Sequence, residues 1–164
     1  MSAADSLQVQ VIRPGQTYVG KQGFTYGAGA SAETVGARHI CMNVLPMPPG
    51  ARAKVHYHER IETIAYMLEG ECVVRFGDRM QHEVLVRQGD HAFVPADLPH
   101  APCNESGAPC TWLVVHSSGS DHDGIVYACA MLFEATRPDP APDAEALRRR
   151  AGVDYFDLLV REIL

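Results

Sequence analysis

Turns built from glycine and proline divide most of this chain into short apolar stretches of strand length. Residues 14–15 (Pro-Gly) close the first stretch, 46–50 close the second, and 77–79 (Gly-Asp-Arg) have the chemistry of a tight hairpin turn. The predicted strands are residues 7–13, 38–45, 71–76, 80–87, 92–94, 110–116 and 125–133. Many short strands separated by such turns favour an all-β barrel or a double-sheet jelly roll over a parallel sheet.

Composition and charge describe an ordinary globular protein of 164 residues, 46% hydrophobic and 21% charged. The formal net charge of -6 argues against nucleic acid or an anionic membrane as a partner, because both attract basic proteins. No apolar run approaches the roughly 18 residues of a membrane span, and the N-terminus lacks the basic and apolar regions of a signal peptide. We therefore predict a cytoplasmic protein, and its five cysteines, an odd number without C-x-x-C spacing, fit reduced thiols.

The C-terminal part differs in character from the rest of the chain. We place a β-barrel domain at residues 1–136 and a short C-terminal helical extension at 137–164, which opens with a stiff Pro-rich linker. The last predicted helix, 155–164, is too apolar to remain in water. It is expected to pack on its own barrel or on a partner subunit, and we predict a homodimer.

Glycine and alanine dominate residues 26–36. These glycines do not form the fingerprint of a phosphate-binding loop between a strand and a helix. We predict a flexible surface loop, and the alternative is a lid at the mouth of the barrel.

A His-x-His pair at residues 56–58 is the first candidate for chemistry. Side chains at alternate positions of a strand share a face, which here groups Arg52, Lys54, His56 and His58. Two neutral imidazoles with a carboxylate from Glu59 or Glu62 make a ligand set suited to Zn, Fe, Mn, Ni or Cu. Taken alone, such a pair is better explained by ordinary histidines at the surface or in the core than by a metal site.

A second stretch, residues 89–104, runs from an apolar strand into a Pro-rich turn that presents His100. Together the two stretches resemble the paired motifs of the cupin superfamily. The first motif is matched by Gly50, His56, His58, Glu62 and Gly70, and the second by Gly89, Pro95, His100 and Asn104, with Asp97 where the family usually has Gly. The resemblance implies a double-stranded β-helix (jelly-roll barrel) and a divalent Fe, Mn, Zn or Ni ion held inside it by His56, His58, Glu62 and His100.

The spacing within the first motif leaves one ligand open. Counting forward from His58 puts Glu62 in the position of the carboxylate ligand, whereas counting back from Gly70 puts Thr63 there. A shift of one residue exchanges the two faces of a strand, so only one of the two points inward unless a bulge intervenes. The apolar residues that share a face with Glu62 favour Glu62, and a three-histidine site is the alternative.

Other residues near the motifs have both functional and structural interpretations. Arg52 and Lys54 could bind the carboxylate or phosphate of a substrate at the pocket rim, or they are solvated cations at a strand end. His116 is expected to be a buried, hydrogen-bonded histidine rather than a fourth ligand. The sequence has no Gly-x-Ser-x-Gly and no cysteine with an evident histidine partner, which disfavours nucleophilic hydrolysis.

A metal with three or four protein ligands leaves coordination positions for water, dioxygen or a chelating small molecule. The resemblance implies a family whose members include dioxygenases, isomerases, lyases and ligand sensors, and fold alone does not choose among them. We expect a metal-dependent enzyme that acts on a small organic acid or oxygenated metabolite, with dioxygenase-like oxidation first. The alternatives are isomerase or lyase chemistry, a non-catalytic barrel that binds a small ligand, and a barrel whose histidines are packing residues.

Overall fold

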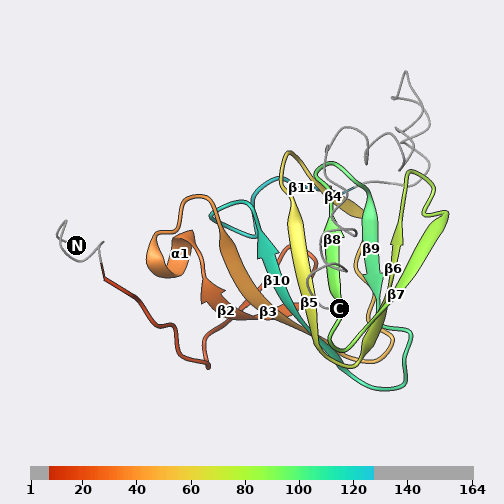
Figure 1. The fold of residues 1–164 in the computed structure, drawn as a ribbon, viewed down its shortest axis with the longest axis horizontal. Helices are drawn as coiled ribbons and strands as arrows, with labels where there is room; N and C mark the ends of the chain where they lie inside the picture. The colour runs from red at the N-terminus through yellow and green to blue at the C-terminus, as the bar shows by residue number, and fades with distance from the viewer. Residues whose placement is uncertain (1–7, 128–164) are drawn as a thin grey trace, which may run out of the picture. The chain divides into compact units, whose positions relative to one another are not determined.

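A computed structural model of the chain describes residues 8–127. Two antiparallel sheets make up the fold (Figure 1). The six-stranded sheet has the order β1 (Thr17–Val19), β2 (Thr25–Ala30), β3 (Cys41–Met47), β10 (Cys110–His116), β5 (Thr63–Glu69) and β8 (His91–Val94). The five-stranded sheet has the order β11 (Ile125–Tyr127), β4 (His56–His58), β9 (His100–Cys103), β6 (Glu71–Phe76) and β7 (His82–Arg87). One short helix, α1 (Ala32–Val35), follows β2.

Strands that are distant in sequence lie side by side in both sheets. Strand β10 lies between β3 and β5, and β9 lies between β4 and β6. From β3 onward the chain passes from one sheet to the other between consecutive strands, except between the paired strands β6 and β7, which is the topology of a double-stranded β-helix. The predicted all-β class and jelly-roll architecture are confirmed.

The core is built from the inward-facing residues of both sheets. In β3 every second side chain is buried, and the buried side chains of β10, Cys110, Trp112 and His116, share one face, as expected for strands with one face in the core. Burying these apolar side chains contributes roughly 25 cal/mol per Å² removed from water. The buried cluster consists of Leu45, Met47, Ala65, Met67, Cys72, Val74, Val86, Cys110 and Trp112.

Several predicted strands have the observed bounds or nearly so. Residues 71–76 and 110–116 coincide with β6 and β10, and residues 38–45 overlap β3. The prediction of a first strand at 7–13 is wrong for its described part, 8–13, which pairs with no strand. Val9 there is 95% exposed, so its apolar residues have no sheet face to cover.

The glycine-rich run is also different from the prediction. Residues 26–30 lie in β2, which pairs with β1 on one side and β3 on the other, and residues 32–35 form α1, so the expected flexible loop is wrong. Gly29 explains the composition, because a Cβ at this position would lie 1.9 Å from the carbonyl oxygen of Met42. The small residues let β2 approach β3 closely.

The predicted linker and C-terminal helices lie outside the described residues. Within residues 8–127, no helix is long and apolar enough to cross a membrane. Four cysteines in this part of the chain, Cys41, Cys72, Cys103 and Cys110, are buried free thiols.

Candidate metal centre

Three histidines from two neighbouring strands converge inside the barrel. His56 and His58 occupy alternate positions of β4 and are buried, and His100 in β9 is the cross-strand partner of His56. The ring centroids of His56 and His100 are 4.3 Å apart, and His58 lies 5.1 Å and 5.6 Å from these two rings. One ligand nitrogen from each ring can be chosen so that all three lie within 4.8 Å of one another.

Backbone carbonyls hold two of the rings in one orientation. The Nδ1 of His56 lies 2.8 Å from the Lys54 carbonyl oxygen, and the Nδ1 of His100 lies 2.9 Å from that of Leu98. A carbonyl only accepts, so each Nδ1 carries the proton and each Nε2 carries a lone pair. Such a second contact is typical of metal-binding histidines, because it fixes the tautomer.

His58 is held differently. Its Nδ1 is buried and has no hydrogen-bond partner within the described part of the chain. An unpaired polar atom in the interior is costly unless a ligand satisfies it. This orphaned nitrogen, together with the two oriented rings, fits a bound metal ion better than three packing residues.

Burial keeps the histidines neutral. Burial, together with the neighbouring imidazoles, lowers the pKa of His56 to about 3 and that of His58 to about 2. The pKa of His100 is lowered for the same reason, burial. Neutral imidazole is the form that binds metals, so these rings need not lose a proton to a metal at neutral pH.

The structure differs from the prediction at Glu62. The Glu62 side chain is exposed and lies outside the three-histidine cluster, and Thr63 takes the inward position at the start of β5. The inward face of β5 continues with Ala65 and Met67, while Ile64 is 52% exposed. The apolar residues that favoured Glu62 therefore lie on the outer face, and the arrangement is the three-histidine alternative.

Thr63 contacts a fourth histidine on the opposite side of the site. His116 in β10 is the cross-strand partner of Thr63, and its Nδ1 lies 2.8 Å from the Thr63 Oγ1. The His116 ring is buried, 4.7 Å from the His58 ring. His116 is thus a buried, hydrogen-bonded residue beside the three-histidine cluster.

Arg52 and Lys54 lie away from the histidine cluster. A bend at Val55 interrupts the chain before β4, so the alternation predicted from Arg52 to His58 does not hold and Ala53 is the buried residue. Neither cation lines the cavity described below.

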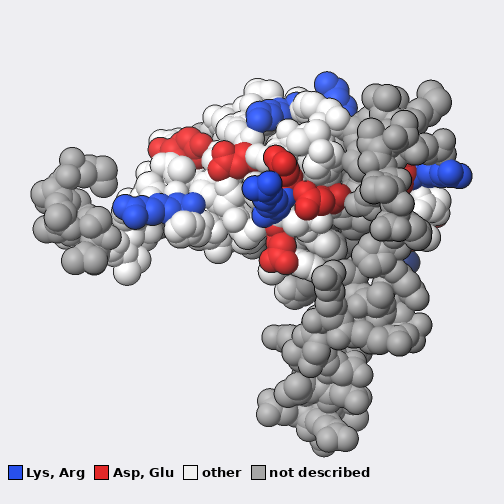
Figure 2. All heavy atoms as spheres, turned by 90° about the horizontal axis from the view of Figure 1, so that it is seen from above, with Lys and Arg blue, Asp and Glu red and all other residues white. Residues whose placement is uncertain are grey.

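Both cations have partners on the surface. Arg52 pairs with Glu105 at 2.9 Å, and the Lys54 Nζ lies over the Tyr127 ring. Figure 2 shows basic and acidic side chains interspersed on one face of the molecule. The Arg52 charge is therefore partly balanced by a carboxylate before any ligand arrives.

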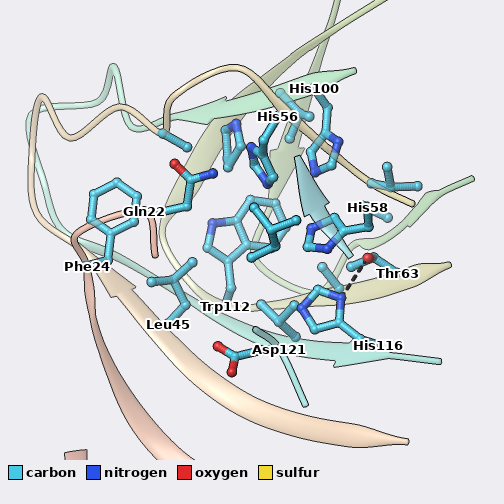
Figure 3. A pocket seen from close by; sticks show the side chains of 18 of the residues that line it. Gln22, Phe24, Leu45, His56, His58, Thr63, His100, Trp112, His116 and Asp121 are labelled. Atoms are coloured by element: carbon cyan, nitrogen blue, oxygen red, sulfur yellow. Dashed lines mark hydrogen bonds between the residues drawn. The ribbon is translucent and has the colours of Figure 1, made fainter. Parts of the chain in front are cut away.

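The histidines line a cavity of about 80 Å³ (Figure 3). A water molecule occupies roughly 10–15 Å³ on this measure, so the cavity suits a small organic molecule. Its polar lining, besides the histidines, includes Gln22, Thr63 and Asp121. Its apolar and aromatic walls include Phe24, Tyr26, Leu45, Ala53, Ala65, Val74, Ala92, Trp112 and Val114.

Sequence reasoning did not place Gln22, Trp112 or Asp121 in the site. Gln22 and Asp121 lie in loops, where no periodic pattern predicts direction. Trp112 shares a strand face with His116, so the alternation in β10 was a signal that could have placed it in the site. Tyr18, whose hydroxyl donates to Asp121 at 2.5 Å, supports that carboxylate from β1.

The remaining residues of the second motif hold the backbone. Asn104 is fully buried, and its amide donates to the carbonyls of Met47 and Ala108. Asp97 has φ 63, the left-handed region that favours glycine, and its Oδ1 accepts a hydrogen bond from the Arg60 backbone. The amide of Asp97 in turn donates to the His58 carbonyl, which links this turn to the site.

Comparisons with known proteins agree with this geometry. Residues 43–116 match the cupin domain family. Germin-like protein 3-5 of Oryza sativa subsp. japonica is 32% identical over 121 residues, which are 70% of this chain and 52% of that protein. Oxalate oxidase 2 of Hordeum vulgare is 31% identical over 121 residues, 70% of this chain and 53% of that protein. The chain therefore spans about half the length of the curated relatives that it matches.

A solved structure supports the fold. A protein with a double-stranded β-helix domain from Klebsiella pneumoniae subsp. pneumoniae superposes with a TM-score of 0.54 at 16% identity, over 79% of this chain and 96% of that one. At this identity the likeness concerns the fold alone.

Proposed function

This chain belongs to the cupin superfamily, and from that premise we propose that it is a metal-dependent enzyme that oxidises a small organic acid or oxygenated metabolite with dioxygen. The observation that carries the proposal is the cluster of three buried, neutral histidines at one cavity. Three protein ligands leave open positions on a divalent metal, as oxidative chemistry requires.

A bound iron or manganese ion would supply Lewis-acid and redox chemistry at those open positions. The protein itself orients the histidine rings and excludes water from the cavity. The carbonyls of Lys54 and Leu98 fix the tautomers of His56 and His100. Apolar walls around the histidines limit the water that reaches a bound ligand, which strengthens polar contacts inside the cavity.

Two further observations support a small oxygen-bearing substrate. The cavity of about 80 Å³ has room for a molecule of few non-hydrogen atoms. Three curated relatives are oxalate oxidases, enzymes named for a small dicarboxylic acid. Because the chain spans about half of those relatives, their activity is carried over here only as a proposal.

The proposal is tested first by metal content and then by oxygen uptake. Protein purified without an affinity tag is analysed by ICP mass spectrometry beside His56→Ala. Samples loaded with Fe(II) or Mn(II) are then followed in an oxygen electrode with a panel of small acids that begins with oxalate and glycolate. We expect near-stoichiometric metal that is lost in His56→Ala, and oxygen uptake with at least one acid. Absence of oxygen uptake across the panel would rule out the oxidative function.

Isomerase or lyase chemistry is the second candidate. Asp121 and His116 both line the cavity, and Figure 3 shows them on the wall below His58. Titratable groups at a small cavity can move a proton at a substrate carbon. Metal-dependent exchange of substrate hydrogen for solvent deuterium, without oxygen uptake, would favour this function over oxidation.

A further inference from the structure

Two buried N–H donors in the cavity have no hydrogen-bond partner. They are the Nε2 of Gln22 and the indole Nε1 of Trp112, and this holds within residues 8–127. Gln22 is 9% exposed and Trp112 is 3% exposed, so neither donor is satisfied at the protein surface. Both side chains line the cavity that holds the three histidines, and Figure 3 shows both pointing into it.

The orientation of the Gln22 amide follows from its other contact. The backbone N–H of Lys54 donates to the Gln22 Oε1 at 3.0 Å. Because a backbone N–H requires an acceptor, the oxygen faces Lys54 and the NH₂ group is left for the cavity. Trp112 has no such choice, since its indole nitrogen can only donate.

Unpaired buried donors are rare in folded proteins, and each one calls for a partner. Here two of them share a cavity with a candidate metal centre. We propose that Gln22 and Trp112 form a subsite that binds the carboxylate or carbonyl oxygens of the small acid whose other end faces the histidines. This inference rests on the proposed function and adds the residues that recognise the substrate.

Charge in the cavity limits where an acid can bind. Asp121 is a buried carboxylate that accepts from the Tyr18 hydroxyl, so an anionic group is disfavoured at that wall. Arg52 and Lys54 do not line the cavity. An acid therefore finds its donors in the neutral groups of Gln22 and Trp112, which suit an oxygen acceptor.

The test uses glycolate as the probe and metal-loaded protein. Trp112 is the single tryptophan of the chain, so its fluorescence reports directly on the subsite. We expect glycolate to change this fluorescence saturably, and ethylene glycol, which lacks the carboxylate, to have no effect at the same concentration. Isothermal titration calorimetry gives the dissociation constant for variants that remove the fluorophore.

Three variants test the two donors. Gln22→Glu keeps an acceptor for Lys54 but replaces the donor with a negative charge, and at pH 8 we expect glycolate binding at least tenfold weaker. Gln22→Met removes the donor without adding charge, and Trp112→Phe removes the indole N–H; each should weaken binding severalfold. Gln88→Glu adds the same charge at an exposed position and should leave binding unchanged.

Metal content and circular dichroism show that each variant is folded and loaded. An unchanged glycolate dissociation constant in Gln22→Glu and Gln22→Met would overturn the inference, and so would wild-type protein that does not bind glycolate or oxalate. Failure of the proposed function is separate: glycolate binding that depends on Gln22, without oxygen uptake, leaves the subsite in place and removes the oxidase. Oxygen uptake that is unchanged in the Gln22 variants would leave the oxidase in place and remove the subsite.

Discussion

Thr63 and His116 face each other across the β5–β10 pair, and the Thr63 Oγ1 lies 2.8 Å from the His116 Nδ1. Both residues are buried, and both line the cavity. The sequence left Glu62 and Thr63 as the two candidates for the inward position of the first motif. The Thr63 hydroxyl occupies it. Because threonine carries no charge, this position is neutral. The Thr63 hydroxyl is hydrogen-bonded to the His116 ring and holds it in place.

Removal of the Thr63 hydroxyl should destabilise the protein through His116. Thr63→Val keeps the shape of the side chain but leaves the His116 Nδ1 buried without its partner. Such an orphan costs about 1–3 kcal/mol. We expect a fall of that size in the free energy of unfolding, measured by urea denaturation. Thr63→Ser, which retains the hydroxyl, is the control and should lose less; equal losses in both variants would contradict the hydrogen-bond explanation.

Metal binding should depend on the three histidines and not on Glu62. The Glu62 side chain is exposed and outside the cluster, whereas His100 is buried within it. We expect His100→Ala to lose bound metal and Glu62→Gln to retain it, both measured by ICP mass spectrometry after loading and dialysis. Loss of metal in Glu62→Gln would show that this carboxylate binds the ion after all.

Stability of the metal-free protein should fall as the solution is made acidic. Burial lowers the pKa of His56 to about 3 and that of His116 to about 4, against about 6.5 in an unfolded chain. Below pH 6.5 the unfolded state therefore binds protons that the folded state does not. The free energy of unfolding decreases as the pH is lowered, until the pKa of the folded state is reached. Each such histidine contributes a slope of up to about 1.4 kcal/mol per pH unit.

The measurement is urea denaturation in EDTA at several pH values between 7 and 4. His56→Asn removes one of the buried groups, so its slope should be shallower by up to about 1.4 kcal/mol per pH unit. His82→Asn makes the same substitution at an exposed position and is the matched control. A slope unaffected by His56→Asn would mean that this ring is protonated in the folded state.

The sequence predicted the fold class and the meeting of three histidines because both depend on local patterns. Gly/Pro turns and strand periodicity are local, and the spacing of His56, His58 and His100 places them at strand positions that the fold brings together. Local patterns could not decide whether Glu62 or Thr63 faces the interior of the barrel. Ile64 and Leu68 are apolar yet lie on the outer face of β5, so apolarity pointed to the wrong side.

Residues that act from loops or through bends were beyond prediction. The bend at Val55 turns Arg52 and Lys54 away from the histidines, and strand alternation contains no signal for such a bend. Gln22 enters the cavity from a turn, where direction depends on contacts made far along the chain. The prediction of a loop at the glycine-rich run was wrong for a related reason. Its small residues allow another strand to approach closely, which is a contact distant in the sequence.

That close approach leads to the last prediction. A Cβ at Gly29 would lie 1.9 Å from the Met42 carbonyl oxygen, which belongs to the backbone and cannot move aside alone. Gly29→Ala should therefore force β2 from β3 and destabilise the protein by about 1–3 kcal/mol, as overpacking does. Gly27→Ala is the matched control on the same strand, because its Cβ would meet the Val44 side chain at an ordinary 3.5 Å. Urea denaturation compares the two, and a Gly29→Ala variant as stable as Gly27→Ala would show that β2 is a mobile loop.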